Sequence, residues 1–98
     1  LLEDDAPEVA REAVRAAGLL GKRQLAHRLI DRIAEPWLTD TVVEALARMG
    51  DRVVGTLRDH LVDRETPAAV RRELPAALQA IGTPAAQHVL IESMLDGD

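Results

Sequence analysis

The amino-acid sequence predicts an all-α fold in which about three pairs of helices stack into an α-α superhelix. Two observations predict this fold: one apolar spacing recurs along the chain, and signals for helix starts and ends separate its copies. The chain has 98 residues, of which 47% are hydrophobic and 1% are aromatic. A chain of this size can bury one modest core, which aliphatic side chains must build.

The recurring spacing is set by three glycines, Gly21, Gly50 and Gly82, which lie about 30 residues apart. The residues twelve, eight, five, four and one positions before each glycine are apolar, and they share one side of a helix. In chain order they are Val9, Ala13, Ala16, Ala17 and Leu20, then Leu38, Val42, Ala45, Leu46 and Met49, then Val70, Leu74, Ala77, Leu78 and Ile81. We therefore predict three internal repeats, each opening with a helix that buries this apolar face.

A second helix is expected to follow each glycine, because glycine readily adopts the left-handed conformation that ends the first helix. Thr66 is followed by Pro67, a pair that offers an N-cap hydroxyl and a proline in the first helical turn. Thr83 and Pro84 offer the same signal. The predicted helices are 6–20, 22–34, 37–49, 51–63, 67–81 and 84–95. The predicted buried positions of the second helices are Leu25, Leu29 and Ile33, then Val54, Leu57 and Leu61, then Val89, Leu90 and Met94.

Pro75 lies inside the predicted helix 67–81 and removes one backbone hydrogen bond, so we predict a bend there. Paired helices, a bend in a first helix, closing glycines and short acidic linkers resemble HEAT repeats. The short repeat is similar to the bacterial, phycobilin-lyase-like variety, and the resemblance covers the whole chain. It implies a right-handed superhelix whose second helices line the concave face. Thr-Pro pairs also occur in ankyrin repeats, and Trp37 in a helical repeat suggests tetratricopeptide units, but the remaining signatures of both families are missing.

The chain is expected to be a single repeat domain, 1–98, with units of about 1–34, 35–64 and 65–95. Its last residues, Met94–Asp98, resemble its first, Leu1–Asp5, as if a fourth unit began there. The chain also lacks an initiating methionine. We therefore expect it to be excised from a longer protein.

Charge and composition narrow the classes of partner and compartment. The net charge of −5 argues against a nucleic-acid surface, which is normally basic. No cysteine is present, so disulfides and thiolate metal sites are excluded. No apolar run is long enough for a membrane span, and no signal-peptide pattern opens the chain. We expect a cytoplasmic domain without direct membrane insertion. In one alternative, the longer parent protein is associated with a membrane.

The candidate site is a set of polar residues on the second helices, which we call the second-helix strip. Its members lie six and ten residues after each glycine, point away from the apolar face and are four apart, one above the other. They are His27, Asp31, Thr56, His60, His88 and Glu92, flanked by Arg23 and Arg52. We predict that the strip binds a protein or peptide. A divalent-metal site of His60, His88 and Glu92 is the sharper alternative, and plain solvated surface is the simpler one.

Charged residues on the first helices alternate in sign from unit to unit. Arg11, Asp40 and Arg72 stand ten residues before the three glycines, and Arg15 and Glu44 stand six before the first two. These residues are expected either to bridge neighbouring helices weakly or to be unrelated surface charges.

No catalytic constellation is visible, since the chain has no cysteine, one serine (Ser93) and no glycine-rich phosphate loop. We expect a non-catalytic interaction or scaffolding module of a larger bacterial protein, with no cofactor, that binds a protein, a peptide or a neighbouring domain of its own chain. The apolar ends of the repeat array also predict a dimer.

Two stretches, GDRVVGTLRDHL and RRELPAALQAIG, are similar to HEAT segments beside bacterial transporter-like and cyclic-nucleotide-binding domains. That resemblance implies a regulatory linker as an alternative function. Two rival functions are phycobilin-lyase-like activity and DNA binding by a HEAT module. DNA binding would require a basic concave face, whereas the second-helix strip mixes arginines with carboxylates.

Overall fold

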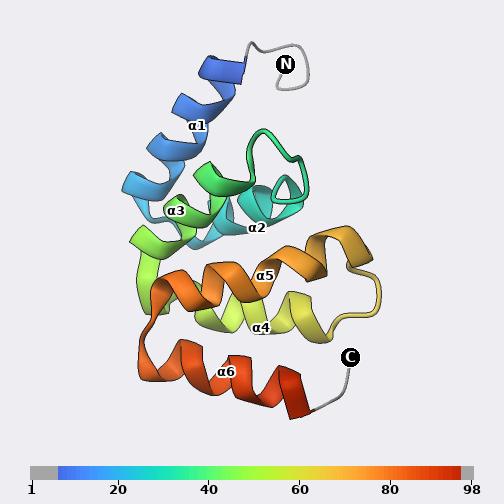
Figure 1. The fold of residues 1–98 in the computed structure, drawn as a ribbon. Helices are drawn as coiled ribbons and strands as arrows, with labels where there is room; N and C mark the ends of the chain where they lie inside the picture. The colour runs from blue at the N-terminus through green and yellow to red at the C-terminus, as the bar shows by residue number, and fades with distance from the viewer. Residues whose placement is uncertain (1–6, 96–98) are drawn as a thin grey trace.

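The computed structural model describes residues 7–95, which are largely helical and contain no strand (Figure 1). The helices are α1 (Pro7–Leu20), α2 (Arg23–Asp31), α3 (Thr39–Met49), the short 3-10 helix η2 (Gly50–Val53), α4 (Val54–Val62), α5 (Ala68–Ile81) and α6 (Pro84–Leu95). The predicted all-α fold is confirmed. Residues 1–6 and 96–98 lie outside the described residues, and with them the first of the two similar chain ends and most of the second. None of the described helices is long and apolar enough to cross a membrane.

The odd-numbered helices form a row in which α3 packs between α1 and α5 (Figure 1). The even-numbered helices pack behind this row. Helix α2 contacts α1, α3, α4 and α5, and α6 packs against both α4 and α5. The described part of the molecule is therefore a short stack, in which α1 lies at one end and α6 at the other.

The second helix ends at Asp31, earlier than the predicted 34, and residues 32–38 form turns. Pro36 disfavours a helical conformation in the residue before it. Side chains hold the turns: the Arg32 guanidinium donates two hydrogen bonds to the Glu35 carboxylate, at 2.7 and 2.9 Å. The Thr39 hydroxyl donates to the backbone carbonyl of Ile33 at 2.6 Å. Trp37 is 39% exposed here, with the Arg32 guanidinium 5.7 Å from its ring centroid.

The three repeat glycines all have positive φ, between 65° and 69°. The backbone N–H of Gly21 donates to the carbonyl of Ala17, and that of Gly82 donates to the carbonyl of Leu78, both at 3.1 Å. Gly50 is the C-cap of α3, and its backbone N–H donates to the carbonyls of the last turn of that helix. All three glycines therefore end their helices as predicted. Gly50 has ψ −142° and begins η2, so the predicted helix 51–63 starts as a tighter 3-10 turn.

Only one of the two predicted threonine caps forms. The Thr83 hydroxyl oxygen accepts a hydrogen bond from the backbone N–H of Ala86 at 3.2 Å, and this hydroxyl also donates to the Asp51 carboxylate. Thr66 is buried and makes no side-chain cap, since α5 begins one residue after Pro67. The prediction for Thr66 is therefore wrong.

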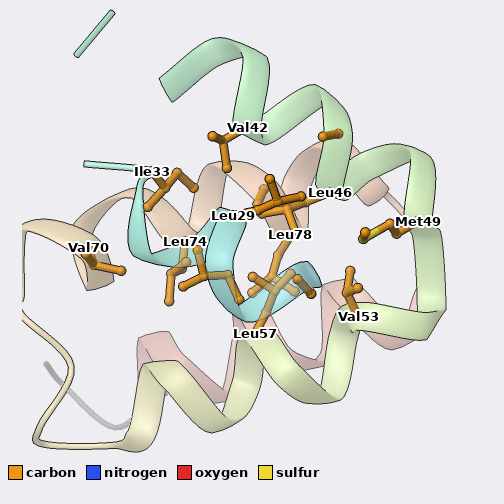
Figure 2. Packing of buried hydrophobic residues seen from close by; sticks show 14 of the residues in the cluster. Leu29, Ile33, Val42, Leu46, Met49, Val53, Leu57, Val70, Leu74 and Leu78 are labelled. Carbon is orange, nitrogen blue, oxygen red and sulfur yellow. The ribbon is translucent and has the colours of Figure 1, made fainter. Parts of the chain in front are cut away.

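The core is one cluster of aliphatic side chains that connects the helices (Figure 2). Leu46, Leu57 and Leu78 are fully buried at its centre. The apolar faces predicted for the second and third repeats are buried as expected, with Ile81 half-buried. Burial of each such leucine contributes about 1.5–3 kcal/mol, so this cluster provides most of the stabilisation of the fold.

The apolar face predicted for the first repeat is not buried. The exposed residues are Val9, Ala13, Ala16 and Leu20. Helix α1 instead packs on α3 through Ala10, Val14 and Gly18. A Cβ atom on Gly18 would lie 2.9 Å from the Cβ of Ala45, so the two helices approach closely at this point. The predicted face stays exposed because the short helix α2 packs behind α3 and does not cover this side of α1.

Met94, predicted to be buried, is 78% exposed near the end of α6. Helix α5 continues through Pro75, so the predicted bend stays a prediction.

The charge pairs predicted on the odd-numbered helices do not form within residues 7–95. Arg15 lies 3.8 Å from Glu12 of its own helix rather than near Glu44. Arg11 donates to the backbone carbonyl of Trp37 at 3.4 Å and does not reach Asp40. The packing of α1 through a neighbouring set of residues turns its arginines away from their predicted partners.

Candidate functional site

Two members of the second-helix strip meet across neighbouring helices. The Nδ1 atom of His27 on α2 lies 3.0 Å from the Nε2 atom of His60 on α4. The ring centroids are 5.2 Å apart and the rings are tilted by 49°. One of these nitrogens is the hydrogen-bond donor and the other is the acceptor. The acceptor nitrogen carries no proton, so its ring is neutral in this contact.

A second polar contact joins α4 to α6. The Glu92 carboxylate lies 3.4 Å from Nε2 of His88, one turn earlier on α6, and 3.4 Å from Nε of Arg58 on α4. Arg58 was not among the predicted site residues. The sequence could have indicated Arg58, because this residue lies about one repeat before Glu92. That spacing places the two residues on neighbouring second helices.

Three other predicted members of the strip are exposed but take no part in these contacts. Arg23 and Asp31 lie at the two ends of α2. Arg52 lies in η2, and its guanidinium lies over Gly21 at the end of α1. A Cβ atom added to Gly21 would be 3.1 Å from this guanidinium. These residues extend the polar character of the face without adding a defined cluster.

Thr56 is buried, at 8% exposure, and does not belong to the surface strip. The prediction counted α-helical turns from Gly50. Residues 50–53 form a 3-10 helix with about three residues per turn. This tighter winding rotates α4 about its axis relative to the α-helical count, and Thr56 faces the core.

The predicted metal trio is not assembled. Within residues 7–95, no group of three or more histidine, aspartate or glutamate side chains is close enough to hold a metal ion. His60 contacts His27 on α2, whereas His88 and Glu92 contact each other on α6. The alternative of a metal site at His60, His88 and Glu92 is therefore wrong.

Ser93, the only serine, is engaged with its own helix. Its hydroxyl donates to the backbone carbonyl of Leu90 at 2.8 Å, an arrangement common for serine within helices. No histidine or carboxylate contacts this hydroxyl in the described part of the chain. The geometry thus provides no activated nucleophile at Ser93.

No family model matches this chain, and no curated protein or solved structure matches it either.

Proposed function

We propose that this protein is a non-catalytic interaction module, built as a short superhelix of HEAT-like repeats, that binds a protein or peptide through its second-helix strip. The repeat architecture is supported by the positive φ of Gly21, Gly50 and Gly82. It is also supported by the equivalent burial of Leu46 in α3 and Leu78 in α5, each four residues before a repeat glycine.

The observation that carries the binding proposal is the pair of polar contacts that crosses the even-numbered helices. His27–His60 joins α2 to α4, and Arg58–Glu92 joins α4 to α6. These side chains are accessible, so one face presents hydrogen-bond donors and acceptors from three successive helices. A polar surface that is spread over three helices suits a protein or peptide, whereas a small molecule requires a concave, mostly apolar pocket.

The test is affinity capture of partners with the wild-type domain and two variants of equal size. The strip variant carries His27→Ala, Asp31→Ala, His60→Ala, His88→Ala and Glu92→Ala. The control variant changes exposed residues of the odd-numbered helices and carries Glu12→Ala, Asp40→Ala, Glu44→Ala, Arg48→Ala and Gln79→Ala. Circular dichroism establishes that both variants stay helical.

We expect the wild type and the control variant to retain the same partner, and the strip variant to lose it. If the partner is a neighbouring domain of the same chain, chemical labelling replaces affinity capture. That domain should then protect the side chains of the strip from the labelling reagent. Retention of the partner by a helical strip variant would show that the strip is not the binding surface.

A further inference from the structure

A groove lies between the C-terminal part of α4, the N-terminal half of α5 and the C-terminal half of α6. These three helices pack against one another in the lower part of Figure 1. Its volume is about 1540 Å³ and it is open to solvent. Small-molecule pockets are typically enclosed and of about 300–1,000 Å³. The size and openness of this groove instead suit a segment of polypeptide.

The groove concentrates positive charge in an acidic chain. Four arginines line it, namely Arg58, Arg64, Arg71 and Arg72. Arg58 pairs with Glu92, the only carboxylate in the lining. Within residues 7–95, the other three arginines have no carboxylate within ion-pair distance. The net charge of the whole chain is −5, so this local excess of arginine is not a consequence of composition.

Arg71 has an unmet hydrogen-bonding requirement. It is half-buried, and its Nε atom is buried without a hydrogen-bond partner. Buried donors in proteins are nearly always paired, because an unpaired donor has lost its water without compensation. The guanidinium group binds carboxylates through two parallel hydrogen bonds. A carboxylate bound to Arg71 would balance a charge that the fold itself leaves unbalanced.

Large apolar side chains line the groove together with these arginines. They are Leu61, Val62, Pro75, Val89, Met94 and Leu95. Val62, Met94 and Leu95 are 65%, 78% and 81% exposed, although large aliphatic side chains favour burial. The groove thus offers both arginines for carboxylates and an apolar surface for aliphatic side chains.

We propose that this groove binds an acidic amphipathic peptide segment of a partner protein, in which aspartate or glutamate alternates with aliphatic residues. Carboxylates of the segment pair with Arg64, Arg71 and Arg72, while its aliphatic residues cover Val62 and Met94. This is the helix-in-groove mode of recognition, with charge added at the rim. The groove shares Glu92 with the second-helix strip, and Arg58, the partner of Glu92, also lines it. The variants that separate the two proposals therefore leave both residues unchanged.

The chemistry of the groove favours a peptide over a nucleic acid. Proteins that bind single strands stack bases on aromatic side chains. The only aromatic residue of this chain is Trp37, which lies in the turns between α2 and α3 and not in the groove. Phosphates would also leave the exposed Val62, Met94 and Leu95 uncovered.

The test is fluorescence anisotropy with the full chain and three labelled helical peptides of about 15 residues. The first peptide places leucine and glutamate on one face; the second replaces its glutamates by glutamine; the third replaces its leucines by serine. The groove variant is Arg64→Ala with Arg72→Ala, both at exposed positions. The matched control is Arg15→Ala with Arg48→Ala, two exposed arginines outside the groove.

We expect the leucine–glutamate peptide to bind best, and the groove variant to weaken its binding about tenfold or more. The control variant should bind as the wild type does, and so should a four-residue strip variant that carries His27→Ala, Asp31→Ala, His60→Ala and His88→Ala and keeps Glu92, since none of these residues lines the groove. Equal binding by the groove variant, equal binding of the glutamine peptide, or tighter binding of a single-stranded oligonucleotide would each overturn the proposal.

Discussion

At the scale of single residues, Glu35 has the best-defined electrostatic environment in the described part of the chain. Hydrogen bonds from the Arg32 guanidinium lower the pKa of Glu35 below its ordinary value. A carboxyl group with a lowered pKa in the folded state stabilises the fold above its ordinary pKa, and the stabilisation is lost as the pH falls through the folded-state pKa.

We therefore expect Glu35→Gln to lower the free energy of unfolding at neutral pH by up to about 1 kcal/mol, since the pair is partly exposed. The difference from the wild type should become smaller at acidic pH, because the stabilisation is lost as the pH falls through the lowered folded-state pKa of Glu35. Urea unfolding at neutral and at acidic pH measures this. Glu12→Gln, which affects only an exposed pair at 3.8 Å, is the control. An equal loss at both pH values would contradict the electrostatic explanation.

Two helical glycines provide a matched test of close packing. Gly18 faces Ala45 so closely that an added Cβ atom would lie 2.9 Å from its Cβ and 3.0 Å from its Cα, whereas nothing lies within 4 Å of a Cβ atom on Gly55. Alanine is favoured over glycine in a helix by about 1 kcal/mol. Gly55→Ala should therefore raise the free energy of unfolding by up to that amount.

Gly18→Ala should lower the free energy of unfolding, because α1 must move away from the backbone of α3. Thermal unfolding of the two variants gives the comparison directly. If both substitutions stabilise the protein, α1 and α3 do not approach each other closely at Gly18.

The residues of the candidate site show what the sequence alone predicts at this scale. The repeat spacing placed His27 and His60 on neighbouring second helices, and α2 and α4 do pack together. Thr56 was predicted to be exposed but is buried, because the 3-10 helix η2 changes the winding of the chain just before α4. The spacing of apolar residues does not reveal such a local change of winding. The groove arginines were missed because they come from α4, α5 and the loop between them, which only the packing brings together.

At the scale of elements, α1 is the helix whose packing differs most from the sequence pattern. Its repeat-related apolar face is exposed, and Ala10, Val14 and Gly18 face α3 instead. The pattern predicted a helix correctly, but a helix has a buried face only where a neighbour covers it. The short helix α2, which ends before Pro36, leaves this side of α1 uncovered, so local spacing could not predict the outcome.

Two valines on α1 test this packing. Val14 is 4% exposed and Val9 is 54% exposed. Val14→Ala should lower the free energy of unfolding by about 1–2 kcal/mol through the loss of buried methyl groups. Val9→Ala should change it by less than about 0.5 kcal/mol. Chemical denaturation of the two variants measures both changes in the free energy of unfolding. A larger loss for Val9→Ala than for Val14→Ala would show that α1 buries the face predicted from the sequence.

At the scale of the whole molecule, the helices differ in how firmly they are held. Helix α3 packs between two neighbours and buries several large side chains, whereas α1 at the end of the row buries two small side chains and a glycine. Local opening is easiest where few buried contacts must be broken.

We expect the backbone amides of α1 to exchange with solvent faster than those of α3 by about tenfold or more. Hydrogen exchange followed by mass spectrometry or NMR measures the difference, and the short peptides of α1 and α3 serve as references for intrinsic rates. Equal protection of the two helices would mean that the molecule opens only as a single unit.

The two ends of the stack also expose large apolar side chains. On α1 these are Val9, Leu19 and Leu20, and on α6 they are Ile91, Met94 and Leu95. The dimer expected from the sequence stays a prediction, and sedimentation equilibrium tests it. Leu19→Glu with Leu20→Glu should reduce self-association, while Gln24→Glu with Gln79→Glu, at exposed polar positions, controls for added charge. A monomer at all concentrations would rule the dimer out.

Trp37 has a practical consequence, since it is the only tryptophan in a chain without tyrosine or phenylalanine. Its indole sits among the turns of residues 32–38, beside the Arg32 guanidinium and partly in water. Intrinsic fluorescence of this protein is therefore a probe of one connecting segment. A refolding trace recorded at this fluorophore would time the docking of that segment against α3, and circular dichroism recorded in parallel would time the formation of the helices.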